Sequence, residues 1–94
     1  TVGGGVELGH HVSLHKGVTI GRENRGIRMG SPKIGNYVWV GMNSTIVGNV
    51  TIGNDVLIAP NSFVNFDVPD HSVVIGNPAI IHYREGATEN YIGE

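Results

Sequence analysis

The sequence contains no cysteine, few aromatic residues and no long hydrophobic run. Without cysteine there can be no disulfide framework, no thiolate nucleophile and no zinc site built from cysteines. No apolar stretch approaches the roughly 20 residues that a membrane-spanning helix needs. The formal net charge of −2 also provides no overall attraction to nucleic acid or to an anionic membrane. We therefore expect a protein with no nucleic-acid partner and no membrane association.

The length of 94 residues suits one small domain. Fifteen glycines in so short a chain indicate many tight corners rather than helices. The chain shows no signal peptide and begins within a repeating pattern, at "TVGGGVELG". We expect a piece of a longer cytoplasmic protein, in which further motifs lie upstream.

Aliphatic residues recur every six positions along most of the chain. The spacing breaks once, between Ile20 and Ile34, where a gap of fourteen residues predicts an inserted loop at 22–33. A small or β-branched residue follows four positions after most of the aliphatic ones. The aliphatic series consists of Val2, Leu8, Leu14, Ile20, Ile34, Val40, Ile46, Ile52, Ile58 and Val64.

A six-residue unit can form a short strand followed by a corner at which Gly or Asn adopts backbone angles that other residues resist. Three units close a coil of eighteen residues, and successive coils stack as parallel strands about 4.8 Å apart. The pattern therefore predicts an all-β fold, a parallel β-helix with three-sided coils over residues 1–81 and a tail at 82–94. All ten aliphatic residues are expected to point inward. An antiparallel meander is the alternative, but it requires alternation every two residues, which these segments lack.

Stacking at eighteen residues also predicts which outward side chains lie together. Trp39 falls over Leu57 and Met42 falls over Pro60, while Phe63 also faces outward. This is more apolar surface than so small a prism is expected to expose to water. We therefore expect self-association.

The inserted loop is the main interruption of the repeat, so it is the first place to look for function. It carries four of the six basic residues of the chain, namely Arg22, Arg25, Arg28 and Lys33. A basic loop on a rigid scaffold can hold an anionic ligand such as phosphate, or it can simply be solvated. The residues alone leave both interpretations open. The five histidines show no metal-ligand spacing, and we expect no metal site.

Three segments resemble the serine acetyltransferase group of hexapeptide-repeat acyltransferases. They are "VSLHKGVTIG", "PKIGNYVWVGMNSTIVGNVTIGNDVLIAPNSFV" and "VPDHSVVIGNPAII", and the likeness runs from Val2 to about Ile81. The closing "VP…V.GNPA" pattern is shared with sugar and capsule O-acetyltransferases. The resemblance is thus more specific for the class of enzyme than for its acceptor.

The resemblance implies a left-handed β-helix, a homotrimer with active sites between subunits, and transfer of an acetyl group from acetyl-CoA to the hydroxyl of serine, a step of cysteine biosynthesis. Gly21 and Arg22 match the start of the family's CoA loop, and Met42 and Pro60 match two small positions that line CoA. With the basic loop assigned to CoA phosphates, the implied cofactor-binding residues are Gly21, Arg22, Arg25, Arg28, Met42 and Pro60.

The expected catalytic residues depart from the family's pattern. The family's aspartate–histidine pair would fall just before Thr1, and Ser31 stands where the family has a second histidine before "PKI". Since the reaction needs a base for the hydroxyl proton, His15, one coil after the upstream histidine, is our candidate within this chain. A sugar or capsular polysaccharide acceptor, a non-catalytic assembly protein and a γ-carbonic anhydrase type of β-helix are the alternatives. The last would need dispersed metal-binding histidines, whereas His10, His11 and His15 are bunched.

Overall fold

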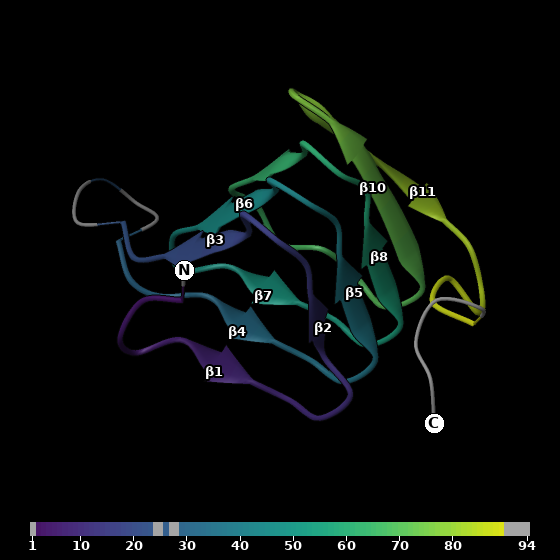
Figure 1. Cartoon of the computed structure of the whole chain (residues 1–94), viewed down its shortest axis with the longest axis horizontal. Coiled ribbons are helices and arrows are strands. Elements are labelled where there is room, and N and C mark those ends of the chain that lie inside the picture. The colour runs from purple at the N-terminus through teal and green to yellow at the C-terminus, as the bar shows by residue number, and fades with distance from the viewer. Residues whose placement is uncertain (1, 24–25, 27–28, 90–94) are drawn as a thin grey trace.

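The computed structural model describes residues 2–23, 26 and 29–89, and it forms a three-sided prism of stacked coils (Figure 1). Sheet A contains β3 (Thr19–Gly21), β6 (Thr45–Val47) and β9 (Phe63–Val64). Sheet B contains β1 (Glu7–Leu8), β4 (Lys33–Ile34) and β7 (Thr51–Ile52). Sheet C contains β2 (Ser13–Leu14), β5 (Val38–Val40), β8 (Val56–Ile58), β10 (Ser72–Gly76) and β11 (Ala79–Tyr83). All strand pairs are parallel except that of β10 with β11.

The six-residue period determines the strand register. Ile34 lies beside Ile52, Val40 beside Ile58 and Ile46 beside Val64, each pair eighteen residues apart. Across the insertion the same rows continue, with Leu8 beside Ile34 and Ile20 beside Ile46. The aliphatic residues from Ile20 to Val64 are buried as predicted, together with the small residues between them. The three-sided parallel β-helix is thereby confirmed.

The first turn of the series differs from the prediction. Val2 and Leu8 are 44% and 45% exposed, and Leu14 is only partly buried. Val2 bridges to Ile20 and Leu8 pairs with Ile34, so each has a neighbouring coil on one side only. These residues lie in the core rows but at an open end of the prism, where nothing among the described residues covers them.

Leu57 is the second departure. Its side chain alternates with the core residues Val56 and Ile58 and so faces outward, yet it is only 8% exposed. In its row it lies between Trp39 and Val73, whose side chains cover it from both sides. The prediction that Trp39 lies over Leu57 on the outer face is confirmed, but Leu57 contributes little to the exposed apolar surface.

A ladder of side-chain oxygens explains the glycines that precede one corner of the coils, namely Gly9, Gly35 and Gly53. We call this the B–C corner, and it comprises residues 10–11, 36–37, 54–55 and 70–71. The backbone N–H of Asn36 donates to Asn54 Oδ1 at 2.8 Å, and the N–H of Asn54 donates to Asp70 Oδ1 at 2.7 Å. A Cβ on Gly35 would lie 2.6 Å from Asn54 Oδ1, so only glycine leaves room for the bond.

The insertion leaves the prism at the corner between sheets A and B (Figure 1). Glu23 and Gly30 form an antiparallel bridge at its base, with N–H···O distances of 3.0 and 2.8 Å. Lys33, which the pattern placed in the loop, is the first residue of β4. The described part of the chain includes no helix long and apolar enough to cross a membrane.

Candidate functional site

His15 lies on the outer surface of sheet C, directly after the last residue of β2. Its N–H donates to the carbonyl of Val40 at 3.2 Å, which fixes its backbone against the next coil. Its side chain is exposed, and the centre of the imidazole lies 4.6 Å from that of the Trp39 ring. The imidazole is therefore held at the surface against an aromatic side chain.

Met42 and Pro60 lie at the corner between sheets C and A, which we call the C–A corner (residues 42–43 and 60–61). Both side chains are exposed, and the N–H of Asn61 donates to the carbonyl of Met42 at 2.9 Å. Leu14 pairs with Val40, so the next residue, His15, lies beside Gly41, which directly precedes Met42. The structure thus brings His15, Met42 and Pro60 to one edge of the prism.

Gly21, Arg22 and Ser31 lie at a different corner, where the insertion begins and ends. Gly21 closes β3, and its carbonyl accepts the N–H of Gly48 at 3.2 Å. Ser31 is partly buried, and its hydroxyl donates to the carbonyl of Gly4 at 3.3 Å. Arg22 is exposed. Arg25 and Arg28 lie outside the described residues.

The sequence-predicted site residues therefore form two groups. The width of sheet A separates His15, Met42 and Pro60 from the residues at the base of the insertion. The strands of sheet A are at most three residues long, which corresponds to about 10 Å. A ligand that touches both groups must either extend across sheet A or bind where two copies of the chain meet.

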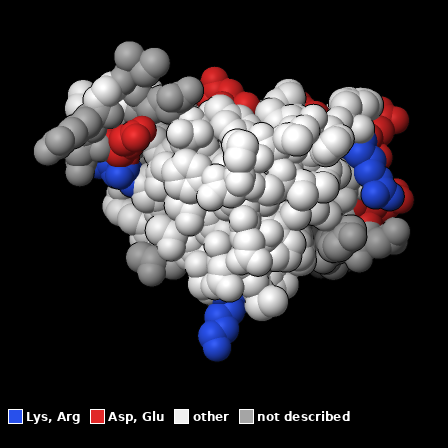
Figure 2. Space-filling view, turned by 90° about the horizontal axis from the view of Figure 1, so that it is seen from above, with Lys and Arg blue, Asp and Glu red and all other residues white. Residues whose placement is uncertain are grey.

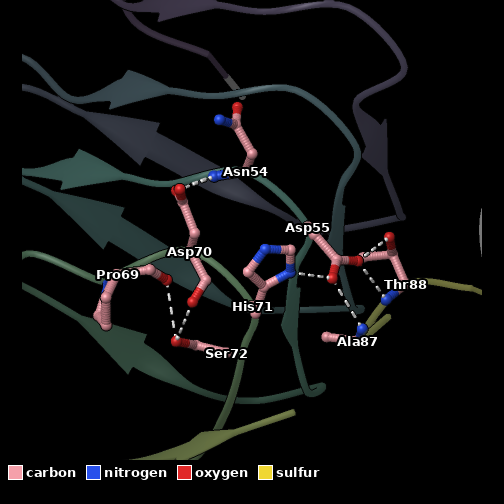
Figure 3. A network of polar contacts seen from close by, with 8 residues as sticks. All are labelled: Asn54, Asp55, Pro69, Asp70, His71, Ser72, Ala87 and Thr88. Carbon is pink, nitrogen blue, oxygen red and sulfur yellow. Dashed lines mark hydrogen bonds and ion pairs between the residues drawn. The ribbon is translucent and has the colours of Figure 1, made fainter. Parts of the chain in front are cut away.

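A further polar network lies at the B–C corner, at residues that are not among the predicted site residues (Figure 3). Asp55 Oδ2 accepts hydrogen bonds from His71 Nδ1 at 2.7 Å and from the N–H of Ala87 at 3.0 Å. Its Oδ1 accepts from the N–H and the hydroxyl of Thr88, at 2.9 and 2.8 Å. One carboxylate thus holds residues 86–89 against the prism.

The electrostatics of this network follow from its contacts. Burial opposes ionisation of Asp55, but the bonds from Thr88, His71 and Ala87 outweigh it and lower the Asp55 pKa to about 2. The hydrogen bond to Asp55 raises the His71 pKa above its usual value, partial desolvation opposes this, and the negative charges of Asp55, Asp70 and Glu85 add to it. Asp55 is therefore ionised at all but strongly acidic pH, and His71 keeps its proton to a higher pH than a free histidine. Where both are charged, the two side chains attract each other.

The sequence repeat does relate Asp55 to His71, but at a spacing that differs from the usual eighteen residues. Asp55 and His71 occupy equivalent corner positions, and both adopt positive φ, 56° and 57°. They are sixteen residues apart instead of eighteen, because Ile52 bridges to Val68 in the last coil. The count of eighteen therefore missed the pairing.

Figure 2 shows one broad face on which no Lys, Arg, Asp or Glu is visible. The charged residues visible in that view gather at its margins. An uncharged face of this kind suits contact with protein rather than with a charged ligand.

The bacterial transferase hexapeptide family (six repeats) matches residues 31–65. Serine acetyltransferase 2 of Arabidopsis thaliana is 44% identical over 72 residues, which are 77% of this chain and 22% of that protein. Serine acetyltransferase of Staphylococcus xylosus is 33% identical over 85 residues, 90% of this chain and 39% of that protein.

Solved structures agree with these relatives. Serine acetyltransferase from Brucella abortus superposes with a TM-score of 0.82 at 35% identity, over 93% of this chain and 35% of that one. The Neisseria gonorrhoeae enzyme in complex with serine gives a TM-score of 0.76 at 40% identity, over 83% of this chain and 32% of that one. The chain thus spans between about a fifth and two fifths of the length of these relatives. The prism is a left-handed parallel β-helix, part of the chain matches the bacterial transferase hexapeptide family, and most of the chain is similar to serine acetyltransferases.

Proposed function

We propose that the protein is an acetyl-CoA-dependent O-acetyltransferase that transfers the acetyl group to the hydroxyl of serine. The observation that carries this proposal is the similarity of most of the chain to serine acetyltransferases, one of them solved with serine. In the reaction the serine oxygen bonds to the thioester carbonyl carbon, a base takes the hydroxyl proton, and the carbon–sulfur bond breaks to release CoA.

We assign the two groups of site residues to one site that forms between two copies of a homotrimer. The edge with Met42 and Pro60 of one copy would line CoA, and the insertion of the next copy would cover the phosphates with its arginines. The exposed positions of Met42, Pro60 and Arg22 on separate corners support this arrangement. Light scattering at micromolar concentration should give a trimer mass or a multiple of it, and a monomer mass would contradict the assignment.

His15 is the proposed acceptor-orienting residue, or the base if no histidine upstream supplies one. Its imidazole is exposed at the edge that carries Met42 and Pro60. Full-length His15→Ala should lose turnover with serine, whereas the exposed His11→Ala at the B–C corner should not. If both variants keep wild-type turnover across the neutral pH range, His15 belongs to the scaffold alone.

Arg22 is the described arginine proposed to contact a CoA phosphate. Full-length Arg22→Ala should bind CoA roughly tenfold more weakly, as expected for one charge-assisted hydrogen bond. The loss should be smaller for dephospho-CoA. Arg84→Ala, an exposed arginine at the opposite end of the chain, is the control. Equal losses for both ligands would remove Arg22 from the phosphate site.

A sugar hydroxyl is the second candidate acceptor, and Ser31 favours it because the serine acetyltransferase group has histidine at this position. The two candidates are separated by following acetyl-CoA consumption by the full-length protein with serine and with a panel of sugars. Consumption with serine alone supports the first proposal. Consumption with sugars alone replaces serine by a sugar, and none with either acceptor refutes both.

A further inference from the structure

His10 and His11 bring two ring nitrogens together at the B–C corner. Their Nδ1 atoms are 2.8 Å apart, and both side chains are exposed. The ring centres are separated by 5.0 Å, and the ring planes meet at 79°. Successive side chains of a strand point to opposite faces. The turn of the chain at this corner is therefore what places the two imidazoles side by side.

The next coil holds the two histidines in position. The N–H of His10 donates to Asn36 Oδ1 at 2.9 Å, and the carbonyl of His10 accepts the N–H of Tyr37 at 3.1 Å. The ring of Tyr37 stacks on that of His11, with centres 4.7 Å apart and planes 8° from parallel. The same ring meets His10 edge-on, with centres 5.6 Å apart. The backbone and the rings of the pair are thus preorganised.

A short distance between two Nδ1 atoms has two chemical uses. In a neutral pair, one ring donates its Nδ1–H to the unprotonated Nδ1 of the other, which is the hydrogen bond of the metal-free protein. When both rings carry their proton on Nε2, both Nδ1 atoms offer a lone pair. Neutral imidazole in this form is a ligand for transition metals. One cation can then take the place of the shared proton.

The distance also selects the kind of cation. Bonds from a metal to imidazole nitrogen are about 2.0 to 2.1 Å long. Two nitrogens bound at a right angle are then about 2.9 Å apart, and two bound at the tetrahedral angle are about 3.4 Å apart. The observed 2.8 Å is closer to the right angle. Tetragonal coordination by nitrogen and oxygen is typical of Cu²⁺ and Ni²⁺, whereas Zn²⁺ prefers a tetrahedron.

The surroundings of the pair suit a cation with few protein ligands. Asn36 and Tyr37, which contact the pair from the next coil, are uncharged, and Glu7 is the only charged residue before Lys16 in the sequence. Within the part of the chain that the structure describes, no further His, Asp or Glu joins the pair to make a group of three. Water would therefore fill the remaining coordination positions.

We propose that His10 and His11 chelate one Cu²⁺ or Ni²⁺ ion through their Nδ1 atoms. Tyr37 is a positioning residue, because its ring fixes the orientation of His11. The site is separate from the proposed acetyl transfer, since the edge with Met42 and Pro60 lies on the other side of sheet C. The spacing of the histidines predicted no metal site, because residues adjacent in a strand diverge, but at the corner they converge.

Calorimetric titration of the full-length protein with single metal ions tests the proposal. In slightly alkaline buffer, Cu²⁺ and Ni²⁺ should bind more tightly than Zn²⁺, and Mg²⁺, which prefers oxygen ligands, should not bind here. His10→Ala and His11→Ala should each weaken Cu²⁺ and Ni²⁺ binding by about tenfold or more, since loss of a group that only orients a ligand already costs about 10- to 100-fold. His82→Ala, an exposed histidine on β11, is the matched control and should change nothing.

Two results of the titration would overturn the proposal. One is that His10→Ala and His11→Ala bind Cu²⁺ and Ni²⁺ as tightly as the wild type. The other is that the site prefers Zn²⁺ to both ions, which would contradict the argument from the right angle. The role of Tyr37 is tested separately. Tyr37→Phe keeps the stacked ring and should keep the affinity, whereas Tyr37→Ala should lower it about tenfold. Equal affinities in these two variants would remove Tyr37 from the site.

NMR of the unmodified protein provides a test that does not depend on the folding of any variant. Cu²⁺ is paramagnetic and broadens the signals of the nuclei closest to it. Substoichiometric Cu²⁺ should broaden the ring signals of His10 and His11 first, followed by those of Tyr37. The ring signals of His82 should stay sharp. Equal broadening of His82 would show that the ion binds exposed histidines without preference, and the proposal would be wrong.

Discussion

Replacing Asp55 with asparagine removes the negative charge and one of the two acceptor atoms that hold residues 86–89. The carboxylate accepts four hydrogen bonds, from His71, Ala87 and Thr88. An amide accepts through one oxygen only and would place its NH₂ group against N–H donors. We expect the variant to fold with residues 86–89 weakly held or detached.

The magnitude follows from the pKa of Asp55, which the network lowers from 3.8 to about 2. That difference corresponds to about 2.5 kcal/mol of unfolding free energy at neutral pH. The corner is open to water on one side, and screening reduces this value. We expect Asp55→Asn to lower stability by about 1 to 2.5 kcal/mol.

The sign of the pH dependence is fixed by the lowered pKa. The stabilisation is fully present above the unfolded value of 3.8 and is lost as the pH falls through about 2. At about pH 3 the difference between wild type and variant should fall to about half, because the unfolded chain is then mostly protonated at this residue.

Urea denaturation at neutral pH and near pH 3 measures both quantities, with Glu7→Gln, an exposed carboxylate on β1, as the control. The explanation is wrong if Asp55→Asn is as stable as wild type at neutral pH. It is also wrong if the loss near pH 3 equals the loss at pH 7.

Three further outcomes are expected. Ile52→Ala should lower the unfolding free energy by about 2 to 5 kcal/mol in urea denaturation, since Ile52 is 1% exposed, whereas the exposed Thr51→Ala should change it little. Gly35→Ala should cost about 1 to 3 kcal/mol, because the added Cβ meets Asn54 Oδ1 and the carbonyl of Gly53, while Gly4→Ala has open space and serves as the control. NMR titration should give His71 a pKa above 6.5 in the wild type and a pKa closer to 6.5 in Asp55→Asn. The stability that His71 contributes should be present below pH 6.5 and should be lost as the pH rises through the raised pKa. An unchanged His71 titration in that variant would show that Asp55 is not its partner in solution.

The repeat could be predicted from sequence because it depends on local spacing. Ile34, Ile46 and Ile58 are buried where the period of six places them, since a coil of fixed length brings each one over its equivalent. The exposure of Val2 and Leu8 was mispredicted because the six-residue period does not show whether anything covers the end of the stack at which a residue lies. For the same reason, the covering of Leu57 by its row neighbours is not visible in its own hexapeptide.

The candidate site was predictable only in part. Placing His15, Met42 and Pro60 along one edge needs only the counting of coils. The contact of Asp55 with Thr88 joins residues 33 positions apart through a segment that lies outside the repeat. No period relates these positions, so only the three-dimensional structure brings them together.

The ladder at the B–C corner makes the coil a unit of duplication. The N–H of the first corner residue bonds to a side-chain oxygen of the equivalent residue in the next coil, as Asn36 does to Asn54. Copying residues 36–53 in tandem would place a new Asn opposite each of the old partners and would lengthen the prism by about 4.8 Å. The bond from Asn54 to Asp70 forms across sixteen residues, so the ladder requires an oxygen-bearing side chain at this corner rather than one fixed coil length. Duplication or deletion of a whole coil can thus change the length of this protein while the corner keeps the same kind of hydrogen bond.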